Sequence, residues 1–344
     1  MSDELPPVRW GVLGAANIAV AKVIPGMMRS ARSRVVAIAS RDESRAAAAA
    51  KALGIPRSYG SYEALLADPE IDAIYNPLPN HLHVPWSIRA AASGKHVLCE
   101  KPIALSAVEA VQLREAQDRS GVLIGEGFMV RSHPQWLEAK RLVDSGALGP
   151  LTLVTGHFSY YRRDASDIRS RVEYGGGALM DIGCYPITLS RWLFGAEPVE
   201  VIAQIDRDPE LGVDRLTSAL MRFPAGQATF ACSGQLVPFQ RMELFGTRGR
   251  IEIEIPFNAP PDLPCRIFVD DGSALGGLAA RAVEFPVVDQ YALQADRFSD
   301  AIRGRGAVPV SVDDAVANMA VIDALFRSAD SRRWEAPVSA SASL

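Results

Sequence analysis

The chain has 344 residues, of which 48% are hydrophobic and 22% charged, and its formal net charge is −4. This length predicts two domains, and the balanced charge argues against nucleic acid and anionic membranes as partners. No apolar run reaches the length of a membrane span, and no secretory signal is visible. Four cysteines without CxxC spacing predict a reducing, cytoplasmic setting. His81 and His83 have no cysteine or carboxylate nearby, so we expect no metal site.

The first part of the chain alternates short apolar runs with helical segments. Because buried strands joined by helices form parallel sheets, this alternation predicts a doubly wound α/β sheet that binds a nucleotide. The predicted strands are residues 8–13, 35–39, 73–75 and 96–99, and the predicted helices lie within residues 14–30, 44–53, 62–67 and 85–93.

A turn of small residues follows the first strand and reads Gly14-x-Ala16-x-x-Ala19, a weakened form of the dinucleotide pattern G-x-G-x-x-G. Small side chains let the backbone approach a pyrophosphate, and the next helix offers its free N–H groups. The alternative is an ordinary small-residue turn in a protein that binds no nucleotide. The predicted phosphate contacts are Gly14, Ala15, Ala16, Asn17 and Ile18.

The end of the second strand indicates which dinucleotide binds. An acidic residue there accepts from the ribose hydroxyl of NAD, but this chain has Ser40 and Arg41, with Arg45 one turn later. A hydroxyl and a guanidinium favour a 2′-phosphate, so we predict NADP, with NAD less favoured. A solvated arginine is the alternative.

A proline-rich loop follows the third predicted strand. We expect Pro77, Leu78, Asn80 and His83 to lie at the carboxyl edge of the sheet, where they contact the cofactor. For Asn80 an alternative is capping of the helix that starts near Val84.

The tetrapeptide Cys99-Glu100-Lys101-Pro102 ends the next apolar run. A lysine at the end of a buried strand, beside a cofactor crevice, can polarise a substrate hydroxyl. The alternative is a surface lysine that follows a strand by chance.

From about Pro150 the pattern changes to long strands with turn signals, which predicts an α+β domain with a large, mostly antiparallel open sheet. We expect the broad face of this sheet to serve as a subunit interface. The expected strands are residues 151–161, 199–206, 215–223, 227–233, 241–245 and 250–255, with 267–270 and 282–288 as edges. Two closing helices, 290–303 and 312–328, precede an Ala/Ser tail that we expect to be disordered.

Within this second part, Gly175-Gly176-Gly177 leads into a helical segment that carries Asp181 and Tyr185 on one face. Gly183 between them costs helix propensity, which suggests that a side chain there would obstruct something. A tyrosine whose pKa is lowered by a lysine can exchange protons with a hydroxyl. A buried tyrosine satisfied by a carboxylate is the alternative.

These motifs together resemble the glucose–fructose oxidoreductase / inositol dehydrogenase (Gfo/Idh/MocA) family over nearly the whole chain. The resemblance rests on the Gly14 turn, Pro79-Asn80-x-x-His83, the segment 94–102 and the glycine-rich segment 175–183. It implies a Rossmann domain (residues 1–128), a substrate-binding and oligomerisation domain (129–338) and a tail (339–344). It also implies nicotinamide-dependent oxidoreduction of a sugar or polyol by a homodimer or homotetramer.

The resemblance implies roles for individual residues. Lys101 matches the catalytic lysine and Asp181 the aspartate of the second motif, and Glu100 belongs to the Glu-Lys-Pro motif. Many members have histidine where this chain has Tyr185, and tyrosine resembles the branch of dimeric dihydrodiol dehydrogenase and NADP-dependent D-xylose dehydrogenase. That branch has alanine where this chain has Gly127. Arg131 and Arg169 become candidates for cofactor or substrate contacts, with surface salt bridging as their alternative.

The expected reaction is hydride transfer between NADP and a hydroxyl or hemiacetal of a sugar or polyol, with Tyr185 as proton acceptor and Lys101 orienting the hydroxyl. Two alternatives stay open. One is a trans-dihydrodiol dehydrogenase whose pocket is lined by Trp136, Phe158, Tyr160 and Tyr161, residues that also suit a core. The other is an NADP-sensing regulator without catalysis.

Overall fold

A computed structural model describes residues 6–338 of the chain. Contacts divide the chain into two compact units, and each is considered by itself. The first comprises residues 6–132 and Asp289–Val316, and the second comprises His133–Val288 and residues 317–338. The expected domain boundary between residues 128 and 129 assigned Asp289–Val316 to the second domain, whereas these residues belong to the first unit. The tail expected at 339–344 lies outside the described residues.

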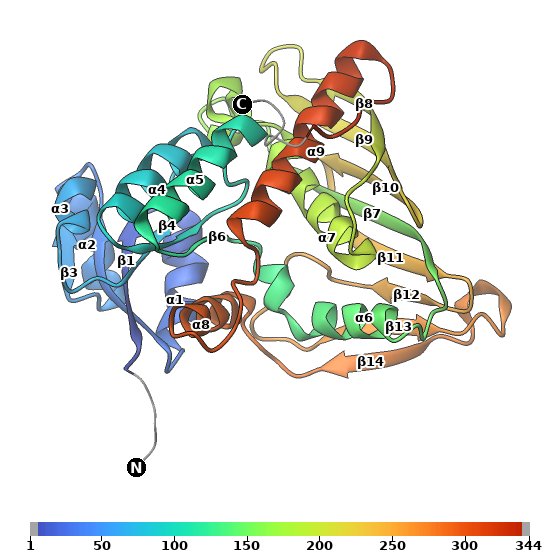
Figure 1. Ribbon diagram of the computed structural model, residues 1–344, viewed down its shortest axis with the longest axis horizontal. Coiled ribbons are helices and arrows are strands. Elements are labelled where there is room, and N and C mark those ends of the chain that lie inside the picture. The colour runs from blue at the N-terminus through green and yellow to red at the C-terminus, as the bar shows by residue number, and fades with distance from the viewer. Residues whose placement is uncertain (1–5, 339–344) are drawn as a thin grey trace. The chain divides into compact units, whose positions relative to one another are not determined.

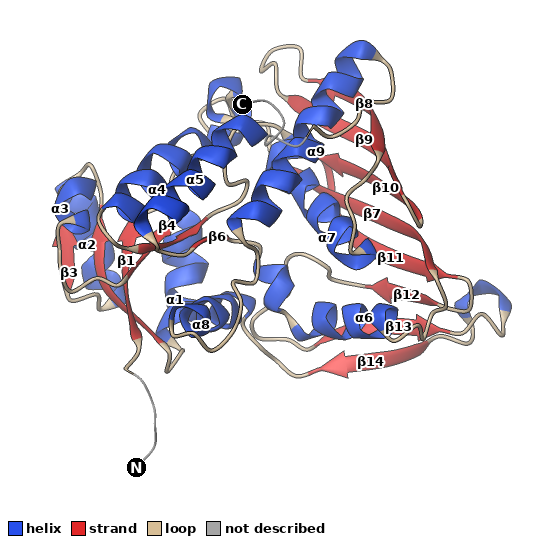
Figure 2. Ribbon diagram, in the orientation of Figure 1, coloured by secondary structure: helices blue, strands red, loops and turns tan. Residues whose placement is uncertain are grey.

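The first unit is built on a six-stranded parallel sheet with the strand order β3-β2-β1-β4-β5-β6 (Figures 1 and 2). The order runs outward from β1 on one side and from β4 on the other, which is the doubly wound arrangement that the alternating pattern predicted. Ligands bind at the carboxyl ends of the strands where the order reverses, here between β1 and β4. The strands are β1 (Val8–Leu13), β2 (Ser33–Ala39), β3 (Arg57–Tyr59), β4 (Ala73–Asn76), β5 (His96–Cys99) and β6 (Ile124–Glu126).

Helices cover both faces of this sheet: α4 and α5 pack together on one face, and α1 and α8 pack together on the other (Figure 1). Buried Trp10 of β1 contacts Phe298 of α8, with ring centroids 5.8 Å apart. The helix expected over 290–303 therefore belongs to this unit and not to the second. The helical segments are η1 (Ala19–Val23), α1 (Ile24–Met28), α2 (Glu43–Leu53), α3 (Tyr62–Leu66), η2 (Asn80–Leu82), α4 (His83–Ala92), α5 (Ala107–Ser120), η3 (Met129–Ser132) and α8 (Gln290–Ile302).

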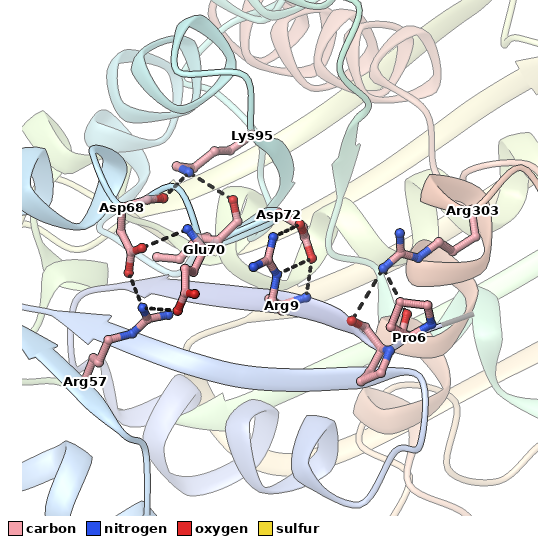
Figure 3. Close-up of polar contacts among 10 residues, drawn as sticks. Pro6, Arg9, Arg57, Asp68, Glu70, Asp72, Lys95 and Arg303 are labelled. Carbon is pink, nitrogen blue, oxygen red and sulfur yellow. Dashed lines mark hydrogen bonds and ion pairs between the residues drawn. The ribbon is translucent and has the colours of Figure 1, made fainter. Parts of the chain in front are cut away.

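The amino ends of β1, β4 and β5 are joined by a partly buried polar cluster (Figure 3). Arg9 donates from its backbone and its guanidinium to Asp72, over 2.8 and 2.7 Å. The ammonium of Lys95, which is 4% exposed, donates to the carbonyls of Asp68 and Ile71 over 2.7 and 2.9 Å. Burial lowers the pKa of Lys95. This cluster fixes the three strands whose other ends carry the candidate cofactor residues.

The second unit contains an eight-stranded sheet with the order β14-β13-β12-β11-β7-β10-β9-β8 (Figure 2). Only β7 and β10 pair in parallel among its named strands, so the expectation of a mostly antiparallel sheet is confirmed. The strands are β7 (Leu151–Tyr161), β8 (Glu200–Arg207), β9 (Asp214–Phe223), β10 (Gly226–Ser233), β11 (Gln235–Gly246), β12 (Arg250–Ile253), β13 (Cys265–Asp270) and β14 (Arg281–Phe285).

Helices pack against this sheet, with α7 against β7 and α6 against β13 (Figure 1). The helical segments are α6 (Pro134–Asp144), η4 (Ile168–Ser170), η5 (Val172–Tyr174), η6 (Leu179–Gly183), α7 (Cys184–Phe194), η7 (Leu275–Gly277) and α9 (Val312–Ser331), whose first turn belongs to the first unit.

One strand is longer than expected. β11 begins at Gln235, six residues before the expected start at Arg241. Its pairing with β7 shifts register between Gln235 and Phe239, and Pro238 lies within this bulge. A bulge breaks the alternation of buried and exposed residues on which the expectation depended.

Candidate functional site

The turn after β1 has the backbone that a dinucleotide site requires. Gly14 has a φ of +87°, a conformation that strains residues with a Cβ, and its N–H donates to the carbonyl of Ala39 over 2.7 Å. A Cβ at Gly14 would lie 3.0 Å from Cδ2 of Leu78. Ala15, Ala16 and Ile18 are half-exposed and Asn17 is exposed, so backbone at this turn is open to a phosphate.

The residues after β2 lie beside that turn. Ser40 is buried and accepts from the N–H of Asp42 over 3.2 Å, whereas Arg41 and Arg45 are exposed. Arg41 forms a hydrogen bond with the hydroxyl of Tyr62, and burial raises the pKa of Tyr62. That hydroxyl would lie 3.6 Å from a Cβ at Gly14. A guanidinium is therefore held near the phosphate-binding turn, which fits NADP.

Hydrogen bonds of Asn76 hold the start of the loop after β4 against α4. The amide of buried Asn76 donates to the carbonyl of His83 over 3.1 Å and to Ser87 over 3.0 Å. Pro77 and Leu78 are buried. Asn80 lies in the short helix η2, and α4 starts at His83 with Leu82 as its N-cap and no side-chain cap. Asn80 therefore lies in the turn that precedes α4, and its predicted contact with the cofactor stays a prediction.

His83 lies in the interior at the start of α4. It is 1% exposed, and its ring nitrogens lie 2.7 Å from the carbonyl oxygen of Pro102 and 2.6 Å from that of Leu78. Burial lowers its pKa to about 4. His83 thus joins the Leu78 loop to the Lys101–Pro102 turn.

Lys101 follows the buried end of β5 and is half-buried. Its neighbour Glu100 accepts from the hydroxyl of Tyr75 over 2.7 Å. The N–H of Ile103 donates to buried Glu126 over 2.8 Å, which secures the other side of the turn. Tyr291 of α8 has a raised pKa because of burial and the nearby Glu100, and Lys101 opposes that rise. Lys101 therefore sits on a rigid turn at the edge where ligands bind.

Arg131 forms an ion pair with Asp314, with Nη1 and Oδ2 3.0 Å apart. Its guanidinium is largely buried, with 11% of the side chain exposed. This contact corresponds to the salt-bridge alternative and ties η3 to the start of α9.

In the second unit, the glycine-rich segment leads into η6 and α7 through close contacts. A Cβ at Gly176 would lie 2.5 Å from the carbonyl oxygen of Arg169. A Cβ at Gly183 would lie 2.8 Å from Leu179 and 2.9 Å from Sγ of Cys232 on β10. A side chain at Gly183 would therefore clash with the sheet, because the helical segment packs directly on β10.

Asp181 is the centre of a polar network. Its Oδ2 accepts from the hydroxyl of Tyr160 over 2.7 Å and from Nε of Arg169 over 3.0 Å. Arg169 also contacts Asp167 over 3.3 Å. The carboxylate of Asp181 raises the pKa of Arg169. Tyr160 was expected to line an apolar pocket or the core, so its role as a donor to Asp181 was missed.

Tyr185 lies in an aromatic cluster on α7. It is 5% exposed, and its ring centroid is 5.9 Å from that of Phe158 and 5.4 Å from that of Phe257. Trp136 is buried, and its indole donates to the carbonyl of Pro256 over 2.6 Å, whereas Tyr161 is 67% exposed. The four aromatic residues of the dihydrodiol alternative therefore have four different environments.

Two family models match the chain. The "Oxidoreductase family, NAD-binding Rossmann fold" model matches residues 8–128, and the "GFO/IDH/MocA C-terminal domain" model matches residues 136–252. The chain belongs to the Gfo/Idh/MocA oxidoreductase family. The two matches cover the Gly14 turn and Lys101 in one case and Asp181 and Tyr185 in the other.

Similar proteins align over nearly the whole length of this Gfo/Idh/MocA chain. An "uncharacterized oxidoreductase ORF334" of Rhizobium meliloti is 50% identical, over 95% of this chain and 98% of its own. A "D-xylose 1-dehydrogenase (NADP(+)) 2" of Haloferax volcanii is 38% identical, over 93% and 97%. The 3-ketoreductase KijD10 of Actinomadura kijaniata, solved with NADP and TDP-benzene, has a TM-score of 0.85 at 29% identity, over 94% and 98%.

The structure was also searched for metal-binding groups, membrane-spanning helices and disulfide bonds. Among residues 6–338, no group of three or more His, Cys, Asp or Glu side chains is arranged to hold a metal ion. Within the same range no helix is both long and apolar enough to cross a membrane. Cys99, Cys184, Cys232 and Cys265 are buried, and none of these four forms a disulfide bond.

Proposed function

We propose that this protein is an NADP-dependent dehydrogenase or reductase that acts on a hydroxyl or carbonyl of a sugar or polyol. The observation that carries the proposal is the full-length similarity to an NADP-dependent D-xylose dehydrogenase in a chain that has both Lys101 and Tyr185. Solved structures of KijD10 include variants in which a lysine or a tyrosine is replaced. The spacing between those two residues equals the spacing between Lys101 and Tyr185 here.

The residues of the first unit fit NADP. The open backbone of the Gly14 turn would take the pyrophosphate, and Arg41 with Ser40 would take the 2′-phosphate. Pro77, Leu78, Asn80 and Glu100 remain proposed contacts at the carboxyl edge of the sheet. When bound, NADP supplies an acceptor or donor of hydride.

The chain's own residues would handle the proton and the charge. Tyr185 would take the proton of the substrate hydroxyl, and the ammonium of Lys101 would orient that hydroxyl and stabilise negative charge on its oxygen. Asp181, held by Tyr160 and Arg169, would orient the substrate beside Tyr185. Arg169 forms ion pairs with Asp167 and Asp181, so we propose that its positive charge acts through these carboxylates.

One screen tests this proposal. NADP reduction is measured by absorbance with D-xylose, other aldoses, polyols, sugar phosphates and trans-1,2-dihydrobenzene-1,2-diol. We expect turnover with a sugar or polyol, and Lys101→Ala and Tyr185→Phe each to lower kcat by about 10² or more. Turnover with the dihydrodiol alone would favour the alternative dehydrogenase. NADP binding without turnover of any compound would favour the regulator.

We further propose that the protein is a cytoplasmic homodimer or homotetramer assembled through the eight-stranded sheet. Four buried cysteines that form no disulfide bond suit a reducing compartment. β11 exposes three large apolar side chains, those of Leu236, Val237 and Phe239. Light scattering at micromolar concentration tests the assembly, and the mass of a single chain would contradict it.

A further inference from the structure

We propose that Asp214 is a positioning residue, which fixes the helical segment carrying Asp181 and Tyr185 by accepting a hydrogen bond from its first amide. The proposal deepens the proposed function and rests on it, because it gives a reason for the placement of the two side chains.

The segment needs a cap from elsewhere in the fold. η6 begins at Leu179, and the preceding Ala178 has no side chain that could accept from the first amides. Asp214, the first residue of β9, supplies the acceptor: its Oδ2 lies 2.6 Å from the N of Leu179. Thr217 donates to the same oxygen over 3.1 Å and holds the carboxylate in place.

Gly177 shows how closely this carboxylate packs against the segment. Its φ is +113°, and a Cβ there would lie only 1.8 Å from Oδ1 of Asp214. The carbonyl of Gly177 accepts from the N–H of Asp181 over 3.0 Å. The glycine therefore joins the Asp214 carboxylate to the backbone of Asp181, and movement of one is transmitted to the other.

Asp214 is also electrostatically unusual. It is 3% exposed, and burial raises its pKa to about 6 although Leu179 and Thr217 oppose the rise. One side of it borders a cavity of about 20 Å³, which is room for a single water, and this cavity is also lined by Tyr160 and Arg169. Asp214 and the two donors to Asp181 therefore line the same small cavity.

Charged and titratable groups surround Asp214 on several elements. The cations nearest to it are Arg207 on β8, Arg215 on β9 and, around the cavity, Arg162 and Arg169. The other titratable groups are Tyr160 on β7, Asp181 on η6 and Cys232 on β10. Because a charged acceptor makes a stronger cap than a neutral one, loss of the charge of Asp214 loosens the start of η6.

The test compares three variants. Asp214→Ala removes the acceptor, and Asp214→Asn keeps an acceptor that cannot ionise. Asp208→Asn is the control, because Asp208 is a second buried carboxylate, close in sequence, whose hydrogen bonds go to Arg163, to Gln235 and to the amides of Glu210 and Leu211. Each is measured by amide hydrogen exchange over residues 177–185 and by D-xylose-dependent NADP reduction between pH 5 and 8.

We expect exchange of the Leu179 amide to be at least tenfold faster in Asp214→Ala, with a fall of about tenfold in kcat and an unchanged KM for NADP. Asp214→Asn, whose acceptor is neutral at every pH, should have the lowered kcat of the protonated wild type and should therefore lack the decline of wild-type kcat below about pH 6. Asp208→Asn should change neither exchange in this segment nor the pH profile.

Several results would overturn the proposal. These are unchanged exchange at Leu179 in either Asp214 variant, a pH profile of Asp214→Asn that equals that of the wild type, or the same losses in Asp208→Asn. If Asp214→Ala does not fold, the exchange and pH profile of Asp214→Asn decide. Wild-type protein that turns over no sugar defeats the proposed function, and the exchange comparison still decides whether Asp214 caps the segment.

Discussion

Replacing Tyr160 by phenylalanine removes one oxygen atom and one hydrogen bond from the network around Asp181. The hydroxyl of Tyr160 and Nε of Arg169 both donate to Oδ2 of Asp181, over 2.7 and 3.0 Å. A hydrogen bond to a charged group contributes about 1.5–3 kcal/mol. If that energy is fully expressed in the transition state, its loss lowers kcat by roughly 10 to 150-fold.

We expect the lower end of this range, a fall of about tenfold in kcat, because Arg169 still holds the same oxygen in the variant. The KM for NADP should stay unchanged, since the proposed phosphate-binding residues belong to the first unit. The assay is steady-state NADP reduction with the sugar that the screen identifies, together with chemical denaturation to confirm that the variant is folded.

Tyr161 provides the matched control. It is the next residue on β7, and successive side chains of a strand point to opposite faces. Because Tyr161 is 67% exposed, Tyr161→Phe should leave kcat unchanged. Wild-type kcat in Tyr160→Phe, or the same loss in both variants, would refute the assignment of Asp181 and its donors to the reaction.

Three further predictions concern the cofactor, pH and stability. Arg41→Asp should lower the ratio of kcat/KM for NADP over NAD at least tenfold, whereas Lys51→Asp on the following helix α2 should not; an equal ratio in both variants contradicts the 2′-phosphate site. Because the folded pKa of Asp214 is raised to about 6, its contribution to stability is present below pH 4 and is lost as pH rises through 6. Denaturation should show the wild type losing about 3 kcal/mol relative to Asp214→Asn between pH 4 and 7, and parallel curves would contradict this. Lys95→Met leaves the carbonyls of Asp68 and Ile71 without their donor and should lower the free energy of unfolding by about 1–3 kcal/mol, so a change under about 0.5 would contradict the bracing role.

Much of the fold could be predicted because its signals are local. The apolar run 8–13 and the strand 151–161 coincide with β1 and β7, since β1 lies between Pro7 and Gly14 and β7 begins directly after Pro150. The Gly14 turn, the Ser40–Arg41 pair and Lys101 were found because the end of a parallel strand has a defined position in a doubly wound sheet.

Contacts distant in sequence could not be predicted in this way. The bond from Tyr160 to Asp181 depends on how η6 packs against β7, which no short pattern encodes. His83 looked like a loop residue open to a ligand, but its burial results from the approach of the Pro102 turn. Asp214 stands at the start of an ordinary strand, and only the fold places it under Leu179.

The position of α8 has a consequence for biosynthesis. Trp10 leaves the ribosome well before Phe298, the ring that contacts it, because Phe298 is synthesised nearly three hundred residues later. The nucleotide-binding half therefore cannot complete its own core while the chain is still growing through the second unit. A fragment that ends at residue 128 would leave Trp10 uncovered, so attempts to produce the cofactor domain alone should include the segment Asp289–Val316.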